Sequence, residues 1–200
     1  LNPFDFKNIR KKSYEKTQKI YKKKNSLKII SVGRLTDQKD FLTLLKAIKI
    51  LKNKREVELV IVGKGREKKR LEDYVLNEKL ETYVRFIGYQ KNPFKFIKQA
   101  DIFILTSLFE GSPNVLVEAL FLKKYVISTN CPTGPREILN NGKYGSLVKI
   151  GDYKEISKIL VNYKKNKIIK KKINLGHNSL KKFSYEINCE KYLNLIKQEI

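Results

Sequence analysis

Short apolar runs alternate with longer amphipathic segments along most of this chain. The runs are rich in β-branched residues and occupy residues 27–32, 57–62, 83–87, 102–105, 125–128 and 146–150. Alternation of this kind is typical of strand-helix-strand crossovers and a parallel sheet. Val60-Ile61-Val62 and Ile102–Leu105 are apolar on both faces, which indicates strands between two layers of helices. We therefore predict an α/β fold with a doubly wound, Rossmann-like parallel sheet.

The segment after the first run shows helical periodicity most clearly. Phe41, Leu44, Leu45, Ile48 and Leu51 recur at three- and four-residue steps, and lysines occupy the opposite face. Such a stripe is expected to cover the sheet. Residues 152–200 are also expected to be helical, with two further stripes: Ile156, Ile159, Leu160 and Tyr163, then Tyr185, Cys189, Tyr192, Leu193 and Ile196.

The length of 200 residues and the 41% hydrophobic content fit one globular domain. Residues 1–25 are basic and weakly patterned, so we expect a linker with a short helix outside the core; residues 26–184 would form the domain and residues 185–200 a final helix. The chain begins with Leu1 and contains no methionine, which suggests a fragment. No apolar run approaches the ~18 residues of a membrane span and no export signal occurs, so we expect a cytoplasmic protein.

The formal net charge is +24, from 44 basic and 20 acidic residues. A basic surface attracts nucleic acid, anionic lipid or acidic small molecules, and biased genome composition would produce the same lysine excess. His177, the single histidine, stands among polar and lysine residues and is expected at the surface. Cys131 and Cys189 have neither metal-site nor CxxC spacing, so no metal site and no role is expected for them.

Ligands of open parallel sheets bind beyond the carboxyl ends of the strands. After the first run, Gly33 is followed by Arg34 and Lys39, a fork and a point charge that suit a diphosphate. The alternative is that Arg34 and Lys39 are two solvated surface cations, which would give the same sequence pattern. Gly63-Lys64-Gly65 lacks the third glycine of a dinucleotide fingerprint and is expected to be a tight turn.

The loop after the fourth run carries the most informative residues. Ser112 is a candidate N-cap and Pro113 a candidate first helical residue, so the amides of Asn114, Val115 and Leu116 would bind phosphate oxygens. Gly111 would let a ligand approach the backbone.

Two carboxylates frame this loop. Glu110 and Glu118 are eight positions apart and would share a helix face about 10 Å apart, each accepting hydroxyl groups. An exposed Glu118 and a Glu110 that merely complements the helix dipole remain the alternative. Residues 129–137, with two prolines and a glycine, are expected to form a rigid turn or a wall of the same crevice.

The order of these motifs resembles the C-terminal, donor-binding domain of the GT-B glycosyltransferases of family 4, which are retaining enzymes. The resemblance spans about residues 1–195. It rests on five features: Gly33-Arg34-Leu35 with Gln38-Lys39-Asp40, the segment Val60 to Gly65, Val84 to Gly88, Ala100-Asp101, and two glutamates separated by seven residues, Glu110 and Glu118.

This resemblance implies roles for particular residues. Arg34 and Lys39 would bind the diphosphate and stabilise the leaving group, so that no metal and no cofactor is needed. Glu118 would accept bonds from the ribose and Glu110 from the donor sugar. The backbone at Gly33, Gly111, Asn114, Val115 and Leu116 would contact phosphate and sugar, and Tyr89-Gln90 would border the base.

It also implies a partner domain that binds the acceptor, a glycan or lipid-linked oligosaccharide. The donor is expected to be a UDP-hexose or UDP-N-acetylhexosamine used for bacterial surface polysaccharides, with peripheral contact to an anionic membrane. The chain alone would bind nucleotide but transfer sugar poorly. The alternatives are a GT-B nucleotide-sugar epimerase, a scaffold domain without activity, and a basic nucleic-acid-binding module. Against the last, no recognised nucleic-acid motif occurs, so nucleic acid is not an expected partner.

Overall fold

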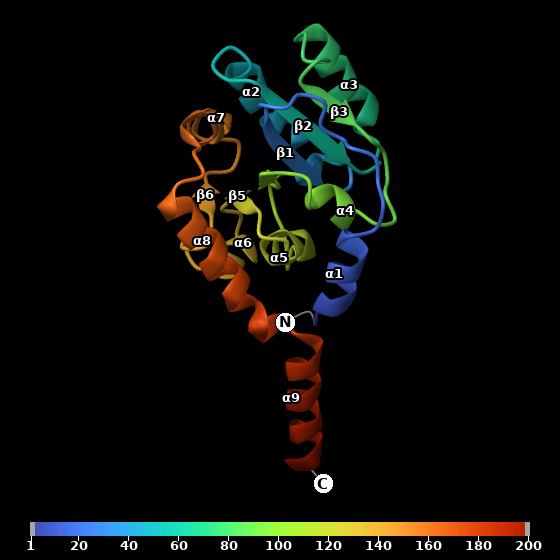
Figure 1. The fold of residues 1–200 in the computed structure, drawn as a ribbon, viewed down its shortest axis with the longest axis vertical. Coiled ribbons are helices and arrows are strands. Elements are labelled where there is room, and N and C mark those ends of the chain that lie inside the picture. Colours follow the sequence, from blue (N-terminus) through green and yellow to red (C-terminus); the bar gives the residue numbers. More distant parts are fainter. Residues whose placement is uncertain (1–2, 199–200) are drawn as a thin grey trace.

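The computed structural model describes residues 3–198, which form a six-stranded parallel sheet covered by helices (Figure 1). The strand order is β3-β2-β1-β4-β5-β6, and every pair is parallel. The strands are β1 (Leu27–Val32), β2 (Val57–Val62), β3 (Val84–Phe86), β4 (Ile102–Leu105), β5 (Tyr125–Thr129) and β6 (Ser146–Val148). The predicted doubly wound α/β fold is confirmed, and the six apolar runs are the six strands.

Helices follow the strands as the alternation predicted. They are α1 (Phe6–Ser13), α2 (Phe41–Leu51), α3 (Lys68–Asn77), α4 (Phe94–Ile97), α5 (Asn114–Phe121), α6 (Pro135–Ile138), α7 (Tyr153–Asn162), α8 (Lys167–Asn178) and α9 (Tyr185–Gln198). Two 3-10 turns, η1 (Asp37–Lys39) and η2 (Ser179–Phe183), complete the chain. No helix within residues 3–198 is long and apolar enough to cross a bilayer.

Successive residues of each central strand point to opposite faces of the sheet, which gives two apolar cores. Ile29, Leu59 and Ile104 face α2, α3 and α7, whereas the neighbouring residues face α4 and α5. The predicted stripe of α2 is entirely buried in the first core: Phe41, Leu44, Leu45, Ile48 and Leu51. The second core includes Ile30, Val60, Phe103 and Val126.

The expectation that residues 1–25 lie outside the core is wrong. Phe4, Ile9, Ile20 and Tyr21 are at most 8% exposed and belong to the second core. The Tyr21 hydroxyl donates to the carbonyl of Ile29, 2.9 Å away. The four side chains stand at irregular spacing in a basic segment, so their burial depends on contacts distant in sequence.

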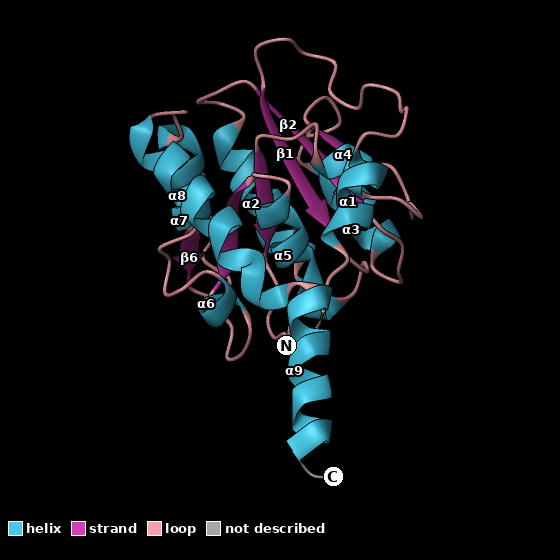
Figure 2. Cartoon of the chain, turned by 60° about the horizontal axis from the view of Figure 1, so that its bottom comes forward, coloured by secondary structure: helices cyan, strands magenta, loops and turns pink. Residues whose placement is uncertain are grey.

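The ends of the described chain meet on one side of the domain. The Phe4 amide donates to the Phe183 carbonyl at 2.8 Å, and the Tyr185 amide donates to the Phe4 carbonyl at 3.0 Å. Beyond this point α9 extends away from the body (Figure 2), and Tyr185, Leu193 and Ile196 are more than half exposed. The final helix predicted over residues 185–200 is thus present through Gln198, while residues 199–200 lie outside the described residues.

Candidate functional site

The centre of the sheet is a topological switch point. From β1 the chain winds through β2 to β3 on one side, and from β4 through β5 to β6 on the other. β1 and β4 are adjacent, with Ile29 opposite Ile102 and Ile30 opposite Phe103. Loops that follow two such strands leave in opposite directions and open a crevice between them. The two loops with the predicted cations and carboxylates are the loops after β1 and β4.

The loop after β1 is packed tightly against the loop after β2. The Gly33 amide donates to the Val62 carbonyl at 3.0 Å. A Cβ on Gly63, whose φ is +152°, would lie 1.8 Å from the Gly33 oxygen, and one on Gly65 would lie 2.2 Å from the Leu35 oxygen. Only glycine permits this approach, so Gly63 and Gly65 serve to fix the loop that carries Arg34 and Lys39, and the turn itself comes at Arg66-Glu67, just before α3.

Lys39 and Glu110 meet across the switch point. The Lys39 ammonium forms an ion pair with the Glu110 carboxylate, and the two side chains are only 14% and 7% exposed. Gly33 adjoins the pair, since its Cβ position lies 3.6 Å from the Lys39 side chain. Two residues predicted to act on one ligand, 71 positions apart in sequence, therefore share one place in the structure.

Ser107 completes this cluster and was not singled out from the sequence. Its fully buried hydroxyl donates to the same Glu110 oxygen at 2.6 Å, and its carbonyl accepts from the Thr129 hydroxyl at 2.6 Å. A serine at the carboxyl end of a strand is too common to mark a site. The sequence does indicate one thing: Ser107 stands three residues before Glu110, close enough for the two side chains to meet.

The loop after β4 is held on both sides. Gln38 donates its side-chain amide to the Phe109 carbonyl at 2.9 Å, and the Thr133 hydroxyl donates to the Glu110 carbonyl. A Cβ on Gly134, whose φ is +84°, would lie 2.3 Å from the Gly111 oxygen. Residues 129–137 therefore pack directly on the loop that carries Glu110.

The predicted start of the next helix is wrong by one residue. Helix α5 begins at Asn114; Pro113 precedes it with φ −71° and ψ 94°, and Ser112 makes no cap bond. The backbone before Asn114 is not helical because Pro113 is extended, so Glu110 and Glu118 do not share a helix face. The Leu116 amide donates to the Pro113 carbonyl at 2.9 Å, which removes it from the set of amides predicted to bind phosphate.

Glu118 is nevertheless in an unusual environment. It lies in the second turn of α5, and burial raises the pKa of its carboxyl group to about 7. Among the described residues no side chain forms an ion pair with it. A carboxyl group that is desolvated without a charge partner is a common feature of binding sites.

The loop after β3 lies beside the loop after β2. Gly88 has φ +68° and its carbonyl accepts from the Gly63 amide at 2.9 Å. Tyr89 is 65% exposed, with the Lys64 ammonium over its ring, and Gln90 donates to the Ile87 carbonyl at 2.8 Å. Tyr89 is therefore accessible to a ligand, while the amide nitrogen of Gln90 is engaged.

The structure thus joins Gly33, Lys39 and Glu110 directly and places Gly111 and the start of α5 next to them in the chain. Arg34 lies exposed on the same loop as Lys39. No hydrogen bond or ion pair within residues 3–198 connects Glu118, Tyr89 or Gln90 to the Lys39–Glu110 pair.

Comparison with known protein families gives a match over residues 13–182 to the glycosyl transferases group 1. The match covers every strand of the sheet and both loops of the switch point. The chain belongs to this family. It is therefore a member of a glycosyltransferase family, and the resemblance seen in the sequence holds at this level.

Relatives that match this chain in sequence include two glycosyltransferases. An uncharacterized glycosyltransferase of Methanocaldococcus jannaschii is 38% identical over 164 residues, which are 74% of this chain and 40% of the relative. The N-acetylgalactosamine-N,N'-diacetylbacillosaminyl-diphospho-undecaprenol 4-alpha-N-acetylgalactosaminyltransferase of Campylobacter jejuni is 31% identical over 169 residues, 82% of this chain and 46% of the relative. The chain spans less than half the length of these curated relatives.

The fold of this group 1 chain also matches solved structures. The crystal structure of Anabaena HepE in complex with UDP and glucose superposes with a TM-score of 0.80 and 20% identity, over 87% of this chain and 49% of HepE. At this identity the likeness concerns the fold. The neighbour confirms the GT-B type of fold for the described part of the chain.

Proposed function

We propose that this chain is the C-terminal, donor-binding half of a retaining GT-B glycosyltransferase of family 4. Residues 26–184 would bind the nucleotide sugar, residues 1–25 would connect this half to the acceptor-binding half, and residues 185–200 would return to it. The observation that carries the proposal is the Lys39–Glu110 contact at the switch point, in a member of the group 1 family. The coverage of relatives, below one half, supports a missing partner half.

In this proposal the diphosphate lies between the loops after β1 and β4. Arg34 is exposed and offers a planar fork of donors, and Lys39 is nearly buried and offers a charge held at a fixed place. As the bond between the sugar and the diphosphate breaks, negative charge grows on the leaving oxygen, and these two cations stabilise it without a metal. The amides of Asn114 and Val115 and the open space above Gly111 would serve the same group.

Glu110 would accept hydroxyl groups of the donor sugar. Lys39 and Ser107 bond to the same carboxylate oxygen, Oε1, which fixes the orientation of the group and leaves Oε2 for a sugar hydroxyl. Glu118 would accept bonds from the ribose, and those bonds would compensate a carboxylate that now lacks a partner. Tyr89, and the free oxygen of the Gln90 amide, would border the base.

A UDP-hexose or UDP-N-acetylhexosamine is the proposed donor. Support comes from two proteins: HepE, solved with UDP and glucose, and the Campylobacter enzyme, whose name specifies transfer of an N-acetylgalactosaminyl group to a diphospho-undecaprenol glycan. We accordingly propose a glycan or lipid-linked acceptor, in the cytoplasm or at the inner face of its membrane. Because that acceptor would bind the other half, the chain alone would bind donor and transfer sugar poorly.

Calorimetric titration of UDP, GDP and uridine tests this assignment. Arg34→Ala is expected to weaken UDP binding by about tenfold and leave uridine unchanged, since one charge-assisted bond to phosphate is lost. Glu118→Ala should weaken UDP and uridine alike. Lys54→Ala, which removes an exposed lysine between α2 and β2 at the opposite end of the strands, is the control and should change nothing. Undiminished UDP affinity in both Arg34→Ala and Glu118→Ala would place the pocket elsewhere.

A further inference from the structure

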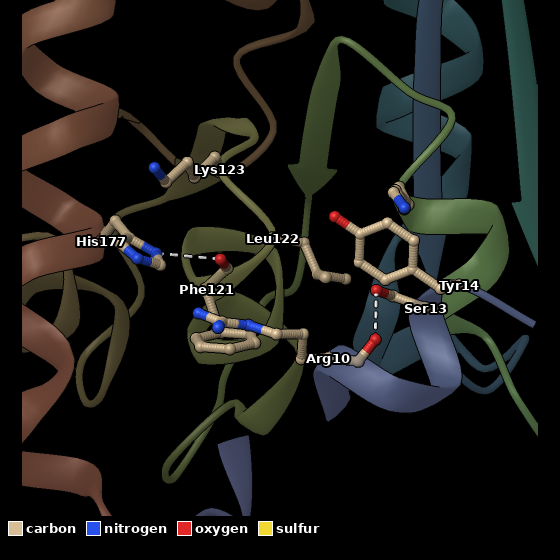
Figure 3. Close-up of a pocket in the computed structure, with 8 residues that line it drawn as sticks. Arg10, Ser13, Tyr14, Phe121, Leu122, Lys123 and His177 are labelled. Carbon is tan, nitrogen blue, oxygen red and sulfur yellow. Dashed lines mark hydrogen bonds between the residues drawn. The ribbon is translucent and has the colours of Figure 1, made fainter. Parts of the chain in front are cut away.

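A second hollow lies at the opposite end of α5 from the proposed donor site. It has a volume of about 320 Å³ and opens between α1, the turn after α4, the end of α5 and α8 (Figure 3). Four basic side chains line it: Arg10, Lys98, Lys123 and His177. No acidic residue is among its lining residues.

His177, predicted at the surface, is half-buried at the mouth of this hollow. Its Nδ1 lies 2.9 Å from the Phe121 carbonyl, and its ring lies 5.5 Å from the Phe121 ring. A Cβ on the adjacent Gly176 would lie 2.8 Å from the Leu120 side chain, so a glycine allows α8 to approach α5 this closely. Because the carbonyl only accepts, Nδ1 carries the proton, and Nε2 is the nitrogen that titrates.

The other three cations have no carboxylate partner. Among the described residues no Asp or Glu oxygen lies within 4.0 Å of Arg10, Lys98 or Lys123. Arg10 instead lies over the Phe121 ring and Lys98 over the Tyr14 ring. Cations gathered without an anion repel one another, and a bound anion would relieve that repulsion.

The end of α5 does not supply the missing negative charge. Helix ends expose carbonyl groups that favour cations. Here these carbonyls already accept hydrogen bonds, Ala119 from the Lys124 amide, Leu120 from the Lys123 amide and Phe121 from His177. These three carbonyls of α5 are therefore already engaged within the protein.

A larger hollow of about 520 Å³ adjoins the first and shares Arg10, Tyr14 and Phe121 with it; the aromatic rings of Phe6, Tyr14 and Phe121 line it together with Lys7, Arg10 and Lys11. Its floor is formed by Phe6, which stacks on Phe121 with ring centroids 4.6 Å apart. Basic and apolar surfaces thus meet at Arg10. A ligand that fits both has an anionic head joined to a hydrocarbon chain.

We propose that this paired hollow binds an anionic phospholipid, with the phosphate ester between Arg10, Lys123 and His177 and the first part of the acyl chain over Phe6 and Phe121. The site is separate from the donor site and does not depend on the function proposed for it. It would attach the α1 side of this domain to an anionic lipid surface.

The single histidine makes this testable by NMR. Burial, together with the charges of Lys123 and Arg10, holds the pKa of His177 below its ordinary value, and Tyr14 and Lys98 face it from α1 and the turn after α4. A phosphate bound beside the ring favours the imidazolium form. Short-chain phosphatidic acid, below its micelle concentration, is expected to raise that pKa by about one pH unit.

Matched ligands decide between the sources of phosphate. The corresponding phosphatidylcholine should leave the pKa unchanged, and inorganic phosphate should bind at least about tenfold more weakly, because it lacks the acyl chain. An equal response to inorganic phosphate would assign a free-phosphate site, and displacement by a single-stranded oligonucleotide at the same concentration would assign a nucleic-acid backbone. Either result, or no response to phosphatidic acid, would overturn the proposal.

Matched variants locate the site. Arg10→Gln is expected to weaken phosphatidic acid binding about tenfold by loss of one charge-assisted hydrogen bond. Lys16→Gln removes the same charge from an exposed residue that follows α1 and should leave binding unchanged. Equal losses in both variants would indicate diffuse attraction to the basic surface and contradict a defined site.

Discussion

Glu118 carries a carboxyl group whose charged form is disfavoured by its surroundings in the folded protein. Its carboxyl group is desolvated on the second turn of α5, and no cation compensates it among the described residues. Desolvation penalises the charged form, so the folded protein holds the proton more tightly than the unfolded chain does. A residue of this kind weakens the fold at neutral pH, which is expected where the group serves a ligand rather than the core.

The pH dependence of stability follows from the sign of this shift. The pKa is raised from 4.5 to about 7, so Glu118 contributes fully below pH 4.5 and its contribution is lost as the pH rises through 7. Glu118→Gln cannot ionise and should be more stable than wild type at pH 8 by up to roughly 3 kcal/mol, with little difference near pH 4.5. Urea unfolding at several pH values measures this.

Glu81→Gln changes an exposed carboxylate and serves as the control. A wild-type stability curve that runs parallel to that of Glu118→Gln across this pH range would contradict a buried, uncompensated carboxyl group.

At the level of elements, glycines decide how closely the loops of the site approach one another. Gly63 lies against the Gly33 carbonyl and Gly134 against the Gly111 carbonyl, so the loops after β1, β2, β4 and β5 form one connected rim. Gly111 itself has open space where its Cβ would be. Packing within the described chain therefore does not require a glycine at this position, and the proposed ligand contact does.

Two substitutions separate these roles. Gly63→Ala would force a Cβ to 1.8 Å from the Gly33 oxygen and should destabilise the protein by more than about 3 kcal/mol. Gly111→Ala meets no atom within 4 Å, so its stability should stay within about 0.5 kcal/mol of wild type while UDP-sugar affinity falls about tenfold. Urea unfolding and calorimetry provide the two readouts, and unchanged affinity in Gly111→Ala would contradict ligand approach at this loop.

The elements themselves were largely predictable, and their contacts were not. A strand buried on both faces needs apolar residues throughout, so β1, β2 and β4 could be bounded to the residue. Ser112-Pro113 is a good cap sequence and predicts a helix start one residue too early, whereas Pro113 is extended in a loop on which residues 129–137 pack, a contact distant in sequence. The pairing of Lys39 with Glu110 required the strand order, which no local pattern contains.

At the scale of the whole molecule, the segment before β1 contributes more to the packed core than its basic composition suggested. Ile20 is 3% exposed and its amide donates to the Gln99 side chain at 3.1 Å, while the Lys22 and Lys23 amides donate to the buried Glu58 carboxylate. Burial raises the pKa of Glu58, but the hydrogen bond from the Ser26 hydroxyl, these two amides and the nearby Arg85 together hold it below its usual value. The basic segment is thereby fixed to β2 and to the second core.

Ile20→Ala is expected to cost about 2 to 4 kcal/mol of unfolding free energy, as for other buried large-to-small changes. Its neighbour Lys19 is exposed, and Lys19→Ala should stay within about 0.5 kcal/mol. Chemical denaturation of the two variants measures the difference. If Ile20→Ala proved as stable as Lys19→Ala, the segment before β1 would contribute nothing to the stability of the core.

The bridge between Phe4 and Ser184 fixes the place at which the chain enters and leaves this domain. A domain joined to both ends would therefore be connected at one place, through two backbone segments that lie side by side. Two adjacent segments can only bend and twist together. A domain attached in this way would therefore approach the crevice along a narrow set of paths instead of sampling every orientation.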